Sequence, residues 1–185
     1  LKLFGSREDI GRAIVDEIFR ETRLHASVGI AHNKFLAKLA SDADKPRGFV
    51  SVDPDPAAVR RFLDPMPVRR LWGIGRKTEP KLRAQGLLTI GQLRRADPAV
   101  LRDLFGNRAG HYLALARGED DREVTPERPD KSISQEQTFD TNLTDQREMK
   151  AELLRQAENV MRRVRRQHLV ARTVTLKVRD HRFQT

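Results

Sequence analysis

The chain has 185 residues, with 36 Lys and Arg against 26 Asp and Glu, so its formal net charge at pH 7 is +10. That length suits one ordinary domain or two small ones, and such a positive charge is typical of proteins that bind polyanions, such as nucleic acids or anionic membrane surfaces. The absence of cysteine excludes disulfides and zinc–thiolate sites. No apolar run approaches the roughly 18 residues of a membrane-spanning helix, so we expect a cytoplasmic protein.

The first fifty residues predict two helices around one short strand. Ser6 can cap a helix over residues 6–21, with Asp9 three positions on, and Ile10, Ile14 and Ile18 form an apolar stripe along it. Residues 25–30 are typical of a strand, and helical periodicity returns over 33–40. This succession indicates the edge of an α/β layer. Because the chain starts inside that layer, we expect it to be a fragment.

Residues 50–118 show only helical signals. Asp-Pro pairs at 55–56 and 97–98 place a capping residue beside a first-turn proline, and glycines stand where helices should end, at Gly86, Gly106 and Gly118. These signals predict a compact unit of short helices. The next segment, "GEDDREVTPERPDK", is polar and contains prolines, which indicates an exposed linker over residues 119–131.

The C-terminal part is predicted to contain two strands around one long helix. Residues 131–139 indicate a strand and residues 145–167 a helix, whose buried side would carry Leu153, Leu154, Ala157, Val160, Met161 and Val164. Residues 172–179, "RTVTLKVR", alternate as a strand does, with Val174, Leu176 and Val178 on one face. Residues 150–185 hold ten Lys and Arg but three Asp and Glu, so the surface for an anionic partner is expected here.

The sharpest local motif is "LWGIGRKTEPKL", residues 71–82, which predicts a helix-hairpin-helix. Gly73 and Gly75 let the backbone approach a ligand, and the amides that follow can hold a phosphate of a nucleic-acid backbone without reading its sequence. The alternative is a plain helix–helix turn with Ile74 in the core. Pro80 is compatible with a helix only if Thr78 caps that helix or if the proline falls in its first turn.

The strand at 172–179 offers a second face for a phosphate backbone, made of Thr173, Thr175, Lys177 and Arg179. The alternative is a solvated sheet face. Arg155, Arg162 and Arg166 repeat at helical spacing on the preceding helix, and they too could simply face solvent.

Lysines mark the region around residues 34–45. Lys34 and Lys38 share one face of the predicted helix, whereas Lys45 lies in a turn fixed by Pro46, where a cation could bind an anionic ligand. Asp42 and Asp44 nearby are more typical of caps or surface charges than of a metal site. The five histidines are scattered without ligand spacing, so we expect no metal site in this chain.

Four segments together resemble the Y-family translesion DNA polymerases in their order and spacing. They are "ASVGIAHNKFLAKLASDADKPRG", "LWGIGRKTEPKL", "KSISQEQTF" and "ARTVTLKVRDHRF", and the resemblance covers essentially the whole chain. It implies an α+β multi-domain fold. The remnant of an α/β palm would span residues 1–49, and an all-helical thumb 50–118, with the helix-hairpin-helix at 67–85. A linker would span 119–131, and the first part of an α/β little finger 132–185.

The resemblance also implies an activity: nucleotidyl transfer from a dNTP to the 3′-OH of a DNA primer, past lesions, by a longer parent protein that is a monomer. Lys45 matches the lysine that contacts the triphosphate. The DNA-binding positions would be Gly73, Ile74, Gly75, Lys77, Lys131, Ser132, Ser134, Arg172, Thr173, Thr175, Lys177 and Arg179. The family's Mg²⁺-binding carboxylates would precede Leu1, so no catalytic residue is expected here. A sliding clamp would bind a C-terminal tail beyond Thr185.

Two other interpretations compete with this one. A polymerase-like accessory protein with a degenerate palm could bind DNA without catalysis, although such a palm has little reason to keep Lys45. An unrelated helix-hairpin-helix repair module would share the hairpin but not the order of the four segments. We therefore expect a polymerase whose isolated 185-residue segment is inactive.

Overall fold

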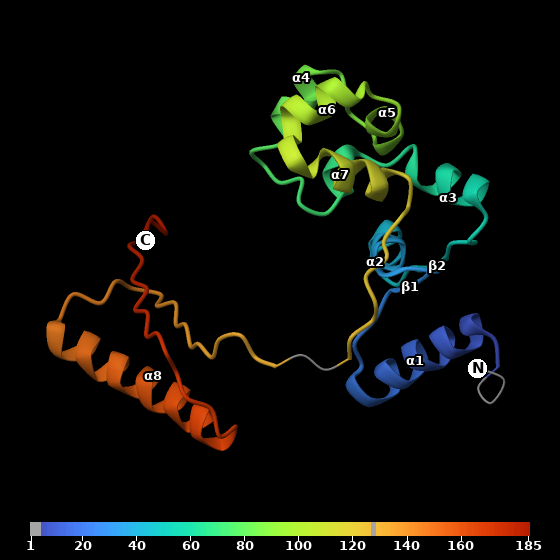
Figure 1. Cartoon of the computed structure of the whole chain (residues 1–185). Coiled ribbons are helices and arrows are strands. Elements are labelled where there is room, and N and C mark those ends of the chain that lie inside the picture. Colours follow the sequence, from blue (N-terminus) through green and yellow to red (C-terminus); the bar gives the residue numbers. More distant parts are fainter. Residues whose placement is uncertain (1–4, 127–128) are drawn as a thin grey trace. The chain divides into compact units, whose positions relative to one another are not determined.

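The computed structural model describes residues 5–126 and 129–185, which fall into two compact units (Figure 1). The first unit runs to Val124 and the second begins at Thr125. This boundary lies inside the segment 119–131 that the sequence indicates as a linker. Within the described residues, no helix combines the length and the apolar character needed to cross a membrane.

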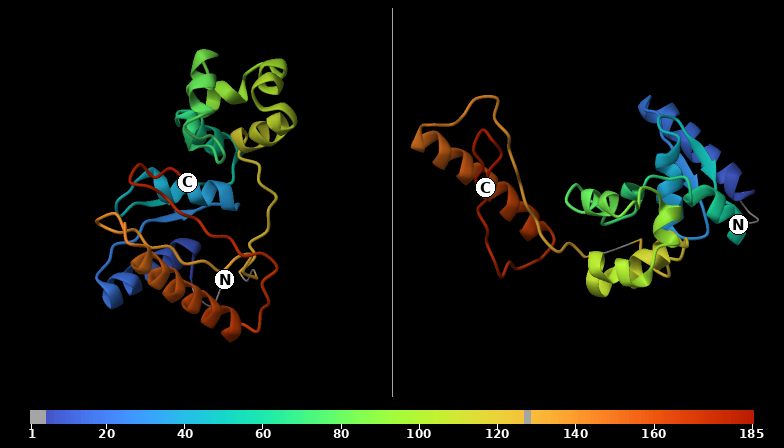
Figure 2. Two further views of the ribbon diagram at one scale, coloured as in Figure 1. Left: turned by 90° about the vertical axis from the view of Figure 1, so that its left-hand side faces the viewer. Right: turned by 90° about the horizontal axis from the view of Figure 1, so that it is seen from above.

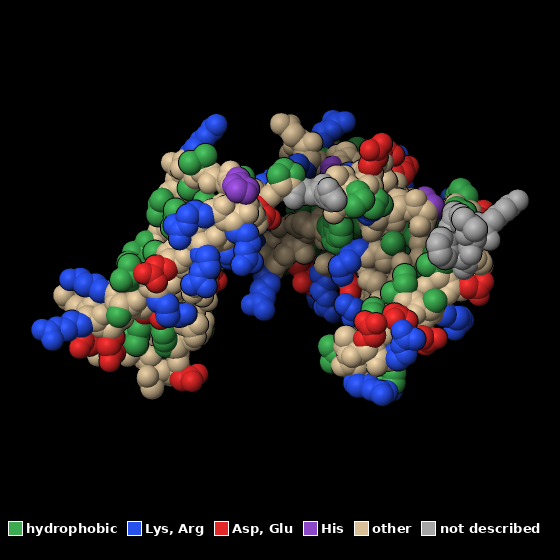
Figure 3. All heavy atoms as spheres, turned by 90° about the horizontal axis from the view of Figure 1, so that it is seen from below, with side chains coloured by type: hydrophobic (Ala, Val, Ile, Leu, Met, Phe, Trp, Pro, Cys, Tyr) green, Lys and Arg blue, Asp and Glu red, His purple; other side chains and the backbone are tan. Residues whose placement is uncertain are grey.

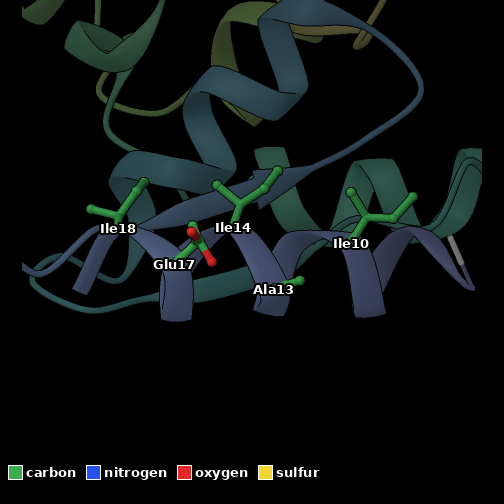
Figure 4. Close-up of a pocket in the computed structure, with 5 residues that line it drawn as sticks. All are labelled: Ile10, Ala13, Ile14, Glu17 and Ile18. Carbon is green, nitrogen blue, oxygen red and sulfur yellow. The ribbon is translucent and has the colours of Figure 1, made fainter. Parts of the chain in front are cut away.

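The first helix, α1 (Arg7–Thr22), begins as the sequence predicts. The amide of Asp9 donates to Ser6 Oγ at 3.1 Å and the amide of Ser6 donates to Asp9 Oδ2 at 2.9 Å, which completes a capping box. The predicted isoleucine stripe lies along one side of the helix and is partly open to solvent, with Ile14 half exposed (Figure 4). The buried position of α1 is Gly11, which faces the ring of Phe49.

Two short parallel strands, β1 (Val28–Ile30) and β2 (Phe49–Ser51), pair with Val28 opposite Phe49 and Ile30 opposite Ser51. The helix α2 (Lys34–Ala43) connects them. A Cβ on Gly29 would collide with the carbonyl of Ala37 and the amide of Ser41, so glycine is what lets α2 lie directly on β1. The prediction of only helical structure from Val50 onward was wrong at its start, because β2 gains its pairing from a strand twenty residues away.

The helical region that follows is confirmed. Asp55 and Asp97 cap their helices through the amides of Ala58 and Ala99, each with proline in the first turn. Left-handed glycines follow the helix ends at Gly86 and Gly118. The elements are α3 (Pro56–Leu63), η1 (Val68–Arg70), α4 (Glu79–Ala84), α5 (Ile90–Arg94), α6 (Pro98–Phe105), η2 (Gly106–Arg108) and α7 (Ala109–Ala116).

One continuous hydrophobic core joins α2 to the helical region. Phe35 and Leu36 of α2 are fully buried in the same cluster as Leu63 of α3, Leu82 of α4 and Leu115 of α7. The first unit is therefore held by packing between elements far apart in the sequence, which fixes the relative positions of its α2 turn and its hairpin.

The second unit contains α8 (Gln146–Arg166), which confirms the helix expected over residues 145–167, and Asp145 caps it. The expected strands at 131–139 and 172–179 are not formed: both segments are extended without a strand ladder, and Figures 1 and 2 draw them as coil. The expected buried side of α8 is confirmed only at Val164, the one buried residue of this helix, and is wrong at residues such as Leu154, which is 61 % exposed. Val174, Leu176 and Val178 are exposed too. A strand needs a partner and a helix face needs a covering layer, and the described residues of this unit supply neither.

Candidate nucleic-acid interface

The hairpin between η1 and α4 is built on two glycines with different roles. Gly73 has φ +91°, and a Cβ there would come within 2.6 Å of Tyr112 Oη, whose hydroxyl donates to the Gly73 carbonyl at 3.2 Å. Gly75 does not have a left-handed φ, and a Cβ built on it meets nothing within 4 Å. Gly73 therefore serves the fold, whereas Gly75 keeps the outer side of the hairpin free of side chain.

The backbone of the hairpin presents amides outward. The Gly75 carbonyl accepts from the amides of Thr78 and Glu79 at 3.0 and 3.1 Å. The amides of Gly75, Arg76 and Lys77 make no hydrogen bond within the part of the chain that the structure describes, and all three residues are exposed. Exposed consecutive amides of this kind suit an anionic ligand such as a phosphate.

Two points left open by the sequence are decided by this geometry. The side chain of Ile74 is buried in the core, as the plain-turn interpretation requires, but its burial leaves the outward amides free, so the two interpretations are compatible. Pro80 falls in the first turn of α4, while Thr78 makes no side-chain capping bond. A proline there removes no helical hydrogen bond.

The charges beside the hairpin are only partly neutralised. Glu79 lies 3.3 Å from Arg83 and 3.8 Å from Arg69, so one carboxylate serves two arginines. Arg76 and Lys77 are exposed next to the free amides. The hairpin therefore combines backbone donors with net positive charge, which is the combination that a nucleic-acid backbone needs.

At the end of α2, Lys45 lies in the turn before Pro46 and pairs with Asp42, which Lys38 also contacts. The hydrogen bonds from Lys38 and then Lys45 lower the pKa of Asp42 to about 2. Asp42 is thus an ion-pair partner that keeps Lys45 near the helix end. Lys34 does not act with Lys38, because its Nζ donates to the carbonyl of Glu123.

The acidic groups that the structure describes were candidates for a metal site. Within residues 5–126 and 129–185, no three His, Asp or Glu side chains converge on one point. The described side chains do not fit a two-metal centre, so no catalytic step through a metal can be assigned to them.

The predicted contacts of the second unit are exposed but are not gathered on a sheet. Lys177 pairs with Glu136 at 2.8 Å, which joins the two extended segments, and Arg163 donates to the carbonyl of Ser134 at 2.9 Å. Figure 3 shows several Lys and Arg side chains standing out from the surface. The remaining predicted positions are all exposed: Lys131, Ser132, Arg172, Thr173, Thr175 and Arg179.

The arginine stripe on α8 is partly occupied by local contacts. Arg155 pairs with Glu152 at 2.6 Å, and that contact lowers the pKa of Glu152. Arg162 donates to Asn159 at 3.1 Å. Sequence reasoning missed Arg163, which reaches across to residue 134; helical spacing alone gives no sign of such a contact.

Sequence profiles of one family match the chain in three consecutive stretches. The impB/mucB/samB family matches residues 1–42, the IMS family HHH motif matches residues 56–87, and the impB/mucB/samB family C-terminal domain matches residues 130–185. The second stretch contains the hairpin described above. The matches therefore cover both units and most of the sequence.

Individual relatives agree with the profiles. The chain is 41 % identical over 180 residues to DNA polymerase IV of Alkalilimnicola ehrlichii, covering 97 % of the chain and 50 % of that protein. It is 42 % identical over 182 residues to DNA polymerase IV of Methanoculleus marisnigri, covering 98 % and 50 %. The chain thus spans about half the length of the curated relatives it matches.

Solved structures show the same likeness. An insertion ternary complex of Dbh DNA polymerase matches with a TM-score of 0.56 and 27 % identity, over 63 % of this chain and 34 % of that one. DinB from Sulfolobus solfataricus matches with a TM-score of 0.54 and 28 % identity, over 60 % and 32 %.

Proposed function

This chain belongs to the impB/mucB/samB family of Y-family DNA polymerases, and from that premise we propose that it serves template-directed DNA synthesis past lesions. The reaction is nucleotidyl transfer from a dNTP to the 3′-OH of a primer. The observation that carries the proposal is the hairpin, whose free amides at Gly75, Arg76 and Lys77 stand on a rigid core beside exposed cations. A duplex backbone offers the phosphates that such a surface can bind.

We propose the domain roles that follow from the family. Residues 1–49 would belong to the palm, 50–118 to the thumb, 119–131 to the linker and 132–185 to the little finger. The parallel strands with α2 support a palm role for the first segment, and the packed short helices support a thumb role for the second. The excess of Lys and Arg in residues 150–185 supports a DNA-holding role for the last.

Lys45 is the proposed contact to the triphosphate of the incoming nucleotide. Its side chain lies just after the end of α2 and is 58 % exposed, and Asp42 restricts its position without burying it. A lysine placed at a phosphate stabilises the negative charge that develops during phosphoryl transfer. Asp42 and the triphosphate would then compete for the ammonium of Lys45. The triphosphate can compete because it carries several negative charges.

Divalent metal ions serve Y-family polymerases, and Mg²⁺ is the ion we propose for this one. It would supply the charge neutralisation between primer hydroxyl and triphosphate. The described side chains of this chain do not form the Mg²⁺ site, so their part is to hold DNA and the triphosphate.

The accessory-protein alternative is not favoured, because the relatives at 41–42 % identity are named DNA polymerase IV. Clamp binding, a monomeric state and a cytoplasmic location stay predictions.

The test of the proposal is the substitution Gly75→Val, measured on the chain as it stands. A valine at Gly75 meets open space in the folded protein, so it should leave the melting temperature unchanged while its branched side chain obstructs the approach of a phosphate. We expect the affinity for primer-template DNA, measured by fluorescence anisotropy, to fall about tenfold, the loss of one or two charge-assisted hydrogen bonds. The salt dependence of binding should become shallower, because fewer phosphates are contacted.

The contrasting variant is Gly73→Val, which should lower the melting temperature strongly. Its Cβ would collide with Tyr112 Oη, and its φ of +91° is strained for valine. If Gly75→Val melts normally and binds primer-template DNA as the unchanged protein does, the hairpin is only a structural turn and the proposal loses its main support.

A further inference from the structure

The segment after α7 contains a carboxylate that is more buried than any linker residue should be. The side chain of Asp120 is only 3 % exposed, and its Oδ2 accepts from the amide of Phe35 at 3.1 Å, in the first turn of α2. The guanidinium of Arg122 donates to both carboxylate oxygens, at 2.6 and 3.0 Å. The pKa of Asp120 is lowered, mainly by this contact with Arg122. The amide of Arg122 is a fourth donor, at 3.4 Å, so a carboxylate held by four hydrogen bonds is a fixed point of the structure.

Arg122 is itself held on its other side by an aromatic ring. Its guanidinium carbon lies 4.7 Å from the centroid of Trp72, within cation–π distance. Trp72 in turn meets the ring of Phe35 edge to face, at 6.4 Å between centroids. The segment is therefore attached both to α2 and, through Trp72, to the hairpin.

Both ends of the segment make further contacts with α2. Asn33 Nδ2 donates to the carbonyl of Gly118 at 2.7 Å, and Lys34 Nζ donates to the carbonyl of Glu123. Gly118 has φ +83° and lies so close to α3 that a Cβ there would be 2.5 Å from Val59. The contacts end at Glu123, one residue before the boundary of the first unit, and Val124 is 76 % exposed.

We propose that residues 118–123 form a latch, with Asp120 as its positioning residue, that fixes the outgoing chain to the start of α2 and to Trp72. The tether, meaning the chain that connects the two units, then begins at Val124 and not at residue 119. Accepting the proposed function, a shorter tether raises the effective concentration of the second DNA-binding unit at a duplex already held by the first. The exposed-linker interpretation of residues 119–131 is corrected at Asp120, whose side chain is 3 % exposed, while the residues on either side of it are exposed as expected.

The latch can be tested on the whole chain without DNA, so its failure and the failure of the proposed function are distinguishable. Trp72 is the only tryptophan, which makes its fluorescence a direct reporter of the Arg122 contact. Glu119 and Glu123 lie within the latch, so a glutamate-specific protease cuts there only when the latch opens. Cleavage after Glu136, in the second unit, provides the internal reference.

The variants are Asp120→Ala and Arg122→Gln, with Asp121→Ala as the matched control because Asp121 is the adjacent, exposed acid. We expect both latch variants to raise cleavage after Glu119 and Glu123 about tenfold relative to Glu136. A tenfold rise in the population of the open latch is what the loss of one hydrogen bond to a charged group would produce. Acrylamide quenching of Trp72 should increase in both, because the guanidinium no longer covers the ring. Asp121→Ala should change neither readout.

Arg122→Lys provides a rescue test, since a lysine keeps the charge but cannot donate a planar pair of hydrogen bonds, and it should restore protection only in part. Thermal melting accompanies each variant. If Asp120→Ala no longer folds, the more exposed Arg122→Gln decides the outcome. The latch is overturned if a folded Arg122→Gln shows the same cleavage and the same quenching as Asp121→Ala. It is also overturned if cleavage rises in Asp120→Ala alone, because Arg122 and Trp72 would then play no part in it.

Discussion

The two units of this molecule both contain helices but differ in what those helices touch. In the first unit, α2 and the helical region from α3 to α7 share a core in which Phe35, Leu36 and Leu63 are almost completely buried. In the second unit, α8 is longer than any of these helices, yet it buries only Val164 among its described residues. Helix length and amphipathicity therefore do not create a core; a second layer does.

The largest expected effect separates the two units directly. Leu36→Ala removes a side chain from the centre of the core and should lower the free energy of unfolding by about 3–5 kcal/mol. Leu154→Ala, the same substitution on the exposed side of α8, should change it by less than about 0.5 kcal/mol. Urea unfolding followed by circular dichroism at 222 nm measures both, and Trp72 fluorescence reports the first unit alone. Equal losses would show that α8 is packed as tightly as α2.

The next effect concerns function within the first unit. In a polymerase of the relatives' full length that carries this chain, Lys45→Ala should lower kcat/KM for the incoming nucleotide by about 10–100-fold, the value of a charge-assisted contact. Affinity for primer-template DNA should stay nearly unchanged, because a triphosphate contact need not touch the duplex. Steady-state kinetics and a DNA-binding titration measure the two quantities.

Lys150→Ala is the control for this prediction, since it removes the same charge from an exposed position on α8. It should leave the KM for nucleotide unaltered. A parallel loss of DNA affinity in Lys45→Ala would identify Lys45 as one more backbone contact.

The smallest effect is a pH dependence at the end of α2. The pKa of Asp42 is lowered to about 2 by Lys38 and Lys45, so its ion pairs stabilise the folded state fully above about pH 4 and lose this effect as pH falls through about 2. Because these lysines are about half exposed, the contribution should be below about 1 kcal/mol.

Melting temperatures of Asp42→Asn and of the unchanged protein measure this contribution. The two should differ slightly at pH 6 and converge toward pH 2. A difference that persists at pH 2 would mean that Asp42 acts through packing. Asp44→Asn is the control, since Asp44 lies in the same turn.

The sequence by itself determined the local features. The capping box of Ser6 and Asp9, the Asp-Pro starts of α3 and α6, and the cap of α8 were all predictable because each depends on residues within one turn. The hairpin and the Lys-Pro turn were predictable for the same reason, and their order along the chain was enough to indicate the family.

Only the tertiary structure decided which surfaces these local elements meet. The three-residue strand β2 exists because β1 pairs with it. The apolar faces of α8 and of residues 172–179 are exposed because no described part of the chain covers them, and Asp120 is held because α2 supplies an amide to it. In a sequence read locally, Asp120 is one more polar linker residue. Asp120 accepts from the amide of Phe35, and its partner Arg122 lies over Trp72. Both residues lie far away along the chain, and contacts of that kind leave no trace in local periodicity.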